Sequence, residues 1–131
     1  MYVRFVVPEH DDSSRVESGI FRVVGNIMDD SSQPEWLRAL LREQVDWFNS
    51  NLPVPDRLWL SFTRRETLYG VCWFRPCAQD VISRARTIQW LMIEADHLVQ
   101  DIYTDAPGTI LYRDNWQVVA KAGDHIPRGF H

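Results

Sequence analysis

Cys77 is the residue whose type and position point most directly to chemistry. It follows a predicted buried strand, residues 69–74, and precedes a predicted helix, residues 78–95. Backbone donors and the helix dipole lower the pKa of a thiol at such a position. Ligands of open α/β sheets also bind at this kind of corner. A small enzyme or an anion-binding protein would use Cys77 there together with Arg84 and Asp105.

The same segment lacks the features that turn such a thiol into a nucleophile. Six residues separate Cys77 from Arg84, one more than a phosphatase-type loop has, and no glycine lets the loop wrap an anion. No neighbouring base is available to activate the thiol. We therefore interpret Cys77 as a small residue near a helix cap rather than as a nucleophile. Cys72, inside the predicted strand, is interpreted as a buried small hydrophobe.

Asp101 and Asp105 form a second candidate pair, with Tyr103 between them. Alternate residues of a strand share one face, so the two carboxylates could act as acid and base or bind a cation. The plainer interpretation places Asp101 on a solvated strand face and has Asp105 begin the turn at residues 107–108.

Arg75, Arg84 and Arg86 are candidates for an anion-binding patch, because the guanidinium fork suits phosphate and carboxylate groups. Scattered arginines in an acidic chain more often form surface ion pairs that contribute little stability. Residues 9–12 have ligand-type side chains, but contiguous residues rarely converge on one ion. The sequence thus predicts no metal and no cofactor, and it assigns no catalytic residue.

Composition narrows the class of protein more than any motif does. The 131 residues carry a formal net charge of −4, which argues against a dedicated nucleic-acid binder. Arginine outnumbers lysine by 13 to 1, a bias typical of a bacterial-type, GC-rich coding sequence. No apolar run is long enough for a membrane helix, and the N-terminus lacks the pattern of a secretory signal. We expect a cytoplasmic location.

Hydrophobic periodicity predicts one α/β domain over residues 1–131, in the order β-α-α-(β)-β-α-β-β-β. Two capping boxes, Ser14–Glu17 and Ser32–Glu35, are expected to begin the first two helices. The third helix has Ile93 on the flank of its apolar stripe and Trp90 opposite that stripe. The expected strands are residues 2–7, 69–74, 98–103, 109–113 and 116–121, with a further candidate at 58–62 and a loosely held tail at 123–131.

These elements predict a sandwich of a mixed sheet of about five strands with three helices. The unit at 69–103 should be a parallel crossover, and the last three strands an antiparallel meander. A two-residue loop at Asp114 would set Leu111 beside Val118 and Ile110 beside Val119. Apolar pairs on both faces then require a cover on both sides, by helices, loops or a partner chain. Three helices are not expected to cover both faces, which favours a homodimer.

Six tryptophans are many for this length, and tryptophan is enriched at protein interfaces. Trp90, Trp116 and Tyr112 are the candidate interface residues. The sequence therefore favours a small cytoplasmic interaction or accessory domain that forms a homodimer, with a protein partner and without a membrane. The alternative is the enzyme or anion-binding protein at Cys77. The sequence names no substrate, ligand or reaction.

Overall fold

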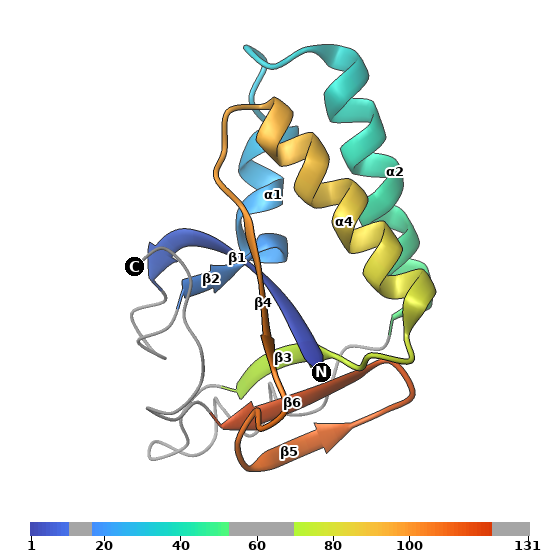
Figure 1. Ribbon diagram of the computed structural model, residues 1–131. Helices are drawn as coiled ribbons and strands as arrows, with labels where there is room; N and C mark the ends of the chain where they lie inside the picture. The colour runs from blue at the N-terminus through green and yellow to red at the C-terminus, as the bar shows by residue number, and fades with distance from the viewer. Residues whose placement is uncertain (11–16, 53–69, 122–131) are drawn as a thin grey trace, which may run out of the picture.

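The computed structural model describes residues 1–10, 17–52 and 70–121. Over these ranges, helices pack on one face of an antiparallel sheet (Figure 1). The helices are α1 (Ile20–Met28), α2 (Glu35–Asn51) and α4 (Gln79–Glu94). The strands are β1 (Tyr2–His10), β2 (Glu17–Gly19), β3 (Gly70–Phe74), β4 (Gln100–Thr104), β5 (Ile110–Arg113) and β6 (Gln117–Lys121). The predicted class, a small domain of mixed helices and strands, is confirmed. The candidate strand at 58–62 and the tail at 123–131 lie outside the described residues.

Strand β1 lies at the centre of the sheet and pairs antiparallel with three strands. Val3 pairs with Tyr103 of β4 and with Phe74 of β3, so these two strands lie on opposite edges of β1. The short β2 pairs with the far end of β1, at Val6. Beyond β3 come β6 and then β5. In the described sheet, β2, β4 and β5 each pair with one strand only and are therefore edge strands.

The pairing corrects two expectations about the sheet. Strands β3 and β4 do run in the same direction, as the crossover predicts, because both are antiparallel to β1. They are not neighbours, since β1 lies between them, and the described pairs are antiparallel rather than mixed. The expected meander is also wrong: β4 pairs with β1, and only β5 and β6 pair as a hairpin. A crossover connection determines the relative direction of the two strands it joins, but it does not determine whether another strand pairs between them.

The register of the β5–β6 hairpin also differs from the expected one. Val119 pairs with Tyr112, and Val118 pairs with Arg113. The register shifts between Ile110 and Tyr112, which leaves Leu111 as one extra residue in β5. The loop spans residues 114–116, because the Asp114 side chain organises a longer turn than the two-residue loop that was predicted.

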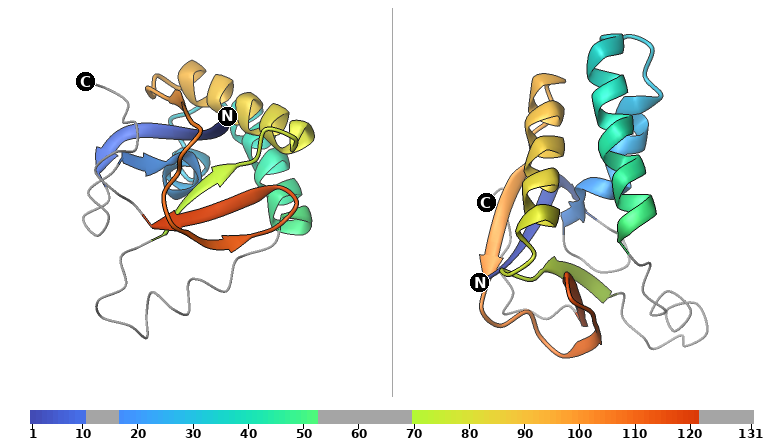
Figure 2. Two further views of the ribbon diagram at one scale, coloured as in Figure 1. Left: turned by 60° about the horizontal axis from the view of Figure 1, so that its bottom comes forward. Right: turned by 90° about the vertical axis from the view of Figure 1, so that its right-hand side faces the viewer.

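Two hydrophobic clusters occupy the two faces of the sheet. Val3, Phe5 and Val7 of β1 face the helices, and Val6 faces the other way. Figure 2 shows the described helices on one side only. The second cluster is Val6, Val71, Trp73, Ile102 and Val118.

Both faces of β6 are covered within the single chain. Val118, Val119 and Ala120 are all fully buried, although successive residues of a strand point to opposite faces. The uncovered β6 surface that suggested a dimer is therefore not present. An interface must be sought elsewhere on the molecule.

The first two helices begin without the predicted capping boxes. Glu17 lies in β2, and α1 starts only after Gly19; Ser14 lies outside the described residues. Helix α2 starts at Glu35 as expected, but no side chain caps it. The Ser32 hydroxyl instead donates to Asp30 at 2.6 Å, because the loop before the helix forms its own turn.

Helix α4 ends in a tight turn in which Asp96 has a positive φ of 65°. The His97 N–H donates to the Met92 carbonyl at 2.9 Å, and the Asp96 N–H donates to the Ile93 carbonyl at 3.0 Å. This is the hydrogen-bond pattern of a Schellman motif, whose left-handed position is usually glycine. Aspartate there accepts some backbone strain.

We expect Asp96→Gly to raise the free energy of unfolding by up to about 1 kcal/mol, because glycine adopts positive φ without a steric penalty. Urea unfolding of the variant beside the wild-type chain measures the change. Asp29→Gly is the matched control. Asp29 caps α1 at φ −89°, so glycine relieves nothing there and should cost roughly 0.5–1 kcal/mol. Equal losses in both variants would contradict the strain at Asp96.

Candidate functional site

The structure gives Cys77 and Asp105 separate surroundings. Cys77 lies two residues before the start of α4, and its exposed thiol is 3.9 Å from the Asn115 carbonyl oxygen. Asp105 lies beyond the end of β4, where an oxygen of its exposed carboxylate is 3.8 Å from the N-terminal nitrogen of Met1. Among the described residues, no hydrogen bond or ion pair joins Cys77 and Asp105. The Cys77 thiol and the Asp105 carboxylate therefore have different partners and do not act on each other.

The candidate anion-binding arginines are also engaged individually. Arg84 donates to the Gln44 side chain of α2 at 3.3 Å, and its guanidinium lies 4.3 Å from the ring centre of Trp47. Arg75 donates to the Asp114 backbone carbonyl at 2.9 Å. Both arginines thus connect elements of the fold. Among the described residues, Arg75 and Arg84 have no shared partner, so their guanidinium groups are not arranged around one anion site.

Arg86 has a different setting, on the side of α4 next to β4. It donates to Asp101 at 3.3 Å and to the Tyr103 hydroxyl at 2.6 Å. Tyr103 in turn donates to Asp101 at 2.6 Å, and Gln89 donates to the second oxygen of that carboxylate at 3.4 Å. Asp101 and Tyr103 therefore share one face of β4, whereas Asp105, the second acid of the predicted pair, lies beyond the end of the strand. The shared face is turned toward α4, and Arg86 balances the charge of Asp101.

Hydrogen bonding controls the charge of Asp101. Burial acts to raise the pKa of this carboxyl, but hydrogen bonds from Tyr103, Gln89 and Arg86 outweigh it and hold the pKa below the ordinary value of 3.8. The hydrogen bond to Tyr103 raises the pKa of Arg86. Asp101 is thus held as a carboxylate with its counter-charge. A general acid needs the opposite, a raised pKa.

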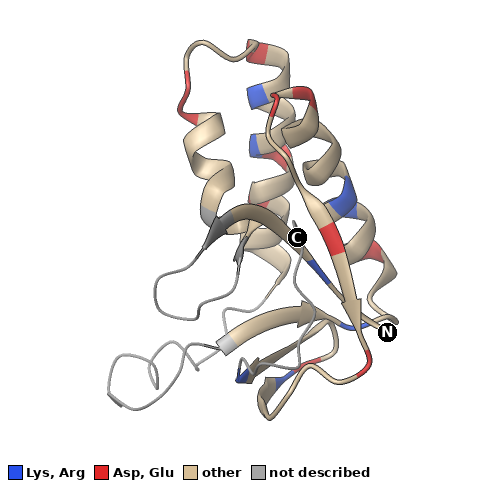
Figure 3. Cartoon of the chain, turned by 60° about the vertical axis from the view of Figure 1, so that its left-hand side comes forward, with Lys and Arg blue, Asp and Glu red and all other residues tan. Residues whose placement is uncertain are grey.

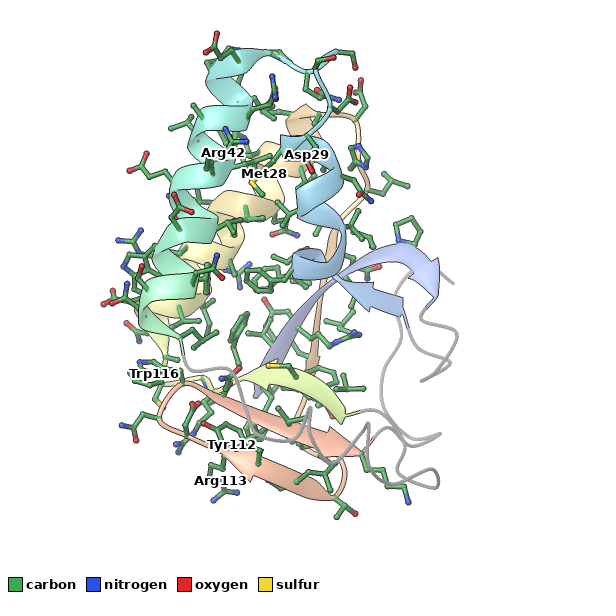
Figure 4. The ribbon with its side chains drawn as sticks, turned by 180° about the vertical axis from the view of Figure 1, so that it is seen from behind. Met28, Asp29, Arg42, Tyr112, Arg113 and Trp116 are labelled. Carbon is green, nitrogen blue, oxygen red and sulfur yellow. The ribbon has the colours of Figure 1, made fainter. Side chains whose placement is uncertain are left out.

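A second polar network organises the turn of the β5–β6 hairpin. Asp114 accepts hydrogen bonds from the backbone N–H groups of Trp116 and Gln117, at 2.8 and 2.9 Å. Its other oxygen accepts from the Tyr112 hydroxyl at 2.9 Å and the Gln117 amide at 3.1 Å. Gln117 is fully buried and accepts from the Cys72 thiol at 3.0 Å. Two of the candidate interface residues, Tyr112 and Trp116, thus belong to this turn (Figure 4).

Asp114→Ala should lower the free energy of unfolding by about 2 kcal/mol, because several donors lose a charged acceptor. Asp105→Ala is the control, since Asp105 makes only a long contact with the N-terminus. Chemical unfolding at neutral pH measures both changes. A loss below about 0.5 kcal/mol for Asp114→Ala, the usual range of a surface substitution, would contradict the role of the network.

The same carboxylate predicts a pH dependence. Burial acts to raise the pKa of Asp114, but bonds from Trp116, Gln117 and Tyr112 hold it below the ordinary 3.8. A depressed folded pKa stabilises the fold above the unfolded value, and the contribution is lost as pH falls through the folded pKa. The gap between wild-type and Asp114→Ala unfolding should therefore be complete at neutral pH and narrow below pH 3.8. A gap that widens on acidification would contradict this assignment.

Exposed apolar side chains lie on α4, on the connection that follows it and on β4. Trp90 is 54% exposed on the outer side of α4, and Ile93 follows it one turn later, also exposed. Leu98 lies in the connection to β4, and Tyr103 lies on β4 itself; both are exposed. We call Trp90, Ile93, Leu98 and Tyr103 the α4–β4 face. Contiguous exposed apolar side chains mark contact surfaces.

Trp90 and Trp116 belong to different regions of the surface. Trp116 lies in the hairpin turn, where its carbonyl accepts from the Arg75 N–H just before α4 begins. Trp90 lies eleven residues beyond the first residue of α4, Gln79, which is about 16 Å along the helix. The three candidate interface residues are thus not a single patch.

Sequence reasoning missed Ile93 and Leu98 as surface residues. Ile93 was assigned to the flank of the apolar stripe, yet it is half exposed, while Leu91 on the other flank is fully buried. The signal was present in the spacing, since Ile93 is seven residues after Arg86 and thus on the same side of the helix. Leu98 lies in a connection and has no periodic signal.

Other kinds of site receive no support from the described residues. Across residues 1–10, 17–52 and 70–121, His, Cys, Asp and Glu side chains form no group of three that could hold a metal ion. Within the same ranges, no helix has the length and apolarity needed to cross a membrane. Residues 11 and 12 of the acidic segment at 9–12 lie outside the described part of the chain.

The chain was compared with family models, curated proteins and solved structures, and no match was found in any of the three comparisons.

Proposed function

We propose that this chain is a small interaction domain that self-associates through the α4–β4 face and has no chemistry of its own. The observation that carries the proposal is the exposure of Trp90, half of whose surface is in solvent, together with exposed apolar neighbours on the same side. Moving such side chains from water into an interface with a partner is favourable, so their burial stabilises the associated state.

Burial of these side chains would supply a large part of an association free energy. A large apolar side chain contributes about 1.5–3 kcal/mol when it passes from exposed to fully buried. Trp90 and Tyr103 also belong to the residue types that dominate binding when they lie near the centre of an interface. The neutral pair of Arg86 and Asp101 beside them adds no net charge that would oppose contact.

A second exposed pair, Trp36 and Leu40, lies one turn apart on α2. It is a smaller surface, because only these two large apolar side chains of α2 are exposed and no strand edge adjoins them. The α4–β4 face combines apolar side chains from a helix, a connection and an edge strand. We therefore assign association to the α4–β4 face and use α2 as the comparison.

The proposal includes a cytoplasmic location and a protein rather than a nucleic acid as partner. Cys72 and Cys77 both remain thiols, the state that the cytoplasm maintains. The acidic net charge of −4 disfavours binding to phosphate backbones. The alternative of an enzyme or anion-binding protein at Cys77, Arg84 and Asp105 has no comparable observation in its favour.

Trp90→Glu tests the proposal, with Trp36→Glu as the matched control because the two tryptophans are 54% and 52% exposed. Burial of a charge without a partner disfavours association strongly. We expect sedimentation velocity at tens of micromolar to show loss of the associated species for Trp90→Glu and its retention for Trp36→Glu. Equal behaviour of the two variants, or loss only for Trp36→Glu, would overturn the assignment to the α4–β4 face.

A further inference from the structure

The edge strands of the described sheet differ in how readily they accept another strand. β2 has only three residues, and its register with β1 shifts between Val6 and His10. β5 has four residues, and its register with β6 is interrupted at Leu111. Bulges of this kind blunt an edge against further pairing. β4 pairs with β1 through five consecutive residue pairs without interruption. The regular edge of the sheet is therefore β4.

Charge does not protect the β4 edge either. Natural edge strands are commonly defended by a charged side chain that would be left unpaired by a second strand. Asp101 is the only charged residue of β4, and Arg86 of α4 already lies 3.3 Å from it. Figure 3 shows this one acidic position on β4. The edge thus carries hydrogen-bonding capacity without a net charge.

Helix α4 presents a stripe of side chains on the same side. Arg86, Trp90 and Ile93 follow one another at intervals of four and three residues, which places them on one side of a helix. Arg86 and Gln89 contact β4, so the stripe borders the side of α4 that faces β4. A strand added to β4 would lie next to this stripe. The partner must therefore offer both a strand edge and an apolar helix side.

We propose that the partner is a second copy of this chain, with its β4 antiparallel to the first β4 about a two-fold axis at Ile102. This inference rests on the self-association proposed above and specifies its geometry. The two-fold axis pairs one β4 edge with the other, and it brings the α4 stripe of one copy toward the α4 stripe of the other. The two sheets become one continuous sheet with the described helices on one face.

Charge selects the register among the three that keep the centre of β4 paired. An axis at Asp101 sets the two Asp101 carboxylates opposite each other, and an axis at Tyr103 sets Asp101 opposite Asp105 of the second copy. Like charges directly opposite destabilise a strand pair. An axis at Ile102 sets Asp101 opposite Tyr103 of the second copy, whose side chain is uncharged. Of the three registers, only this one sets no carboxylate opposite another.

Disulfide trapping tests the register, because cross-strand neighbours have the Cα and Cβ separations that a disulfide requires. Asp101→Cys and Tyr103→Cys are prepared separately in a Cys77→Ser background, which removes the exposed native thiol. Mild oxidation of an equal mixture should give a cross-linked heterodimer, and each variant alone should remain uncross-linked. Dimer formed by Tyr103→Cys alone or by Asp101→Cys alone would overturn the Ile102 axis.

Hydrogen exchange on the wild-type chain supplies a measurement that needs no substitution. The β4 amides that point away from β1, which belong to alternate residues of the strand, should gain protection as the protein concentration rises, while those of β5, the comparison edge, should not. Association without added protection in β4 would overturn the paired-strand geometry and leave self-association intact. Absence of any associated species would overturn the proposed function itself, so the two failures are distinguishable.

Discussion

Trp73→Ala is expected to lower the free energy of unfolding by about 3–5 kcal/mol, the usual cost of truncating a fully buried tryptophan. Trp73 is 0% exposed in β3 and packs in the second hydrophobic cluster, on the face of the sheet that the described helices leave open. Its indole N–H has no hydrogen-bond partner. The side chain therefore stabilises the fold through its apolar area alone.

Trp90→Ala is the matched comparison, since it removes the same atoms from a half-exposed position. We expect a change below about 1 kcal/mol, as for surface substitutions in general. Urea unfolding of both variants at one low protein concentration separates folding from association. A cost for Trp90→Ala close to that for Trp73→Ala would place Trp90 in the core and contradict the exposed α4–β4 face.

Phe48→Ala is expected to cost about 3–5 kcal/mol as well, because Phe48 connects both layers of the fold. Its ring centre lies 4.7 Å from that of Phe21 on α1 and 6.3 Å from that of Phe74 on β3. It is 4% exposed. Loss of this ring removes contacts between α1, α2 and the sheet at the same time.

Phe21→Ala provides the control and a double-mutant cycle. Phe21 is 41% exposed, so its truncation should cost clearly less than that of Phe48. Edge-to-face aromatic pairs contribute about 0.5–1.5 kcal/mol beyond burial, and the coupling free energy of the two substitutions should lie in that range. Additive effects of the two substitutions would contradict the ring contact.

Local patterns predicted the helices and most strands because their causes are local. The apolar spacing of α2 and α4 is a property of each helix alone, and α4 lies within one residue of each expected bound. β2 was missed, since three residues carry no periodic signal. The neighbours of β1 were also missed, because strand pairing is decided by contacts between residues far apart in the sequence.

The candidate site was predicted in part for the same reason. Alternation along one strand places Asp101 and Tyr103 on one face, but Asp105, which was predicted to share that face with Asp101, lies beyond the end of β4. Arg86, which contacts both side chains, was instead grouped with Arg75 and Arg84 as a candidate anion site. The sequence alone does not show which side of a helix faces which strand. The separation of Trp90 from Trp116 likewise depends on how α4 lies relative to the hairpin. It required the three-dimensional structure.

Self-association of the wild-type chain is the central claim, and its native mass tests it most directly. Light scattering coupled to size exclusion, at tens of micromolar, should give a mass near twice that of the 15.4 kDa chain. The mass should fall toward the single-chain value on dilution. A mass of one chain across the whole concentration range would contradict the account.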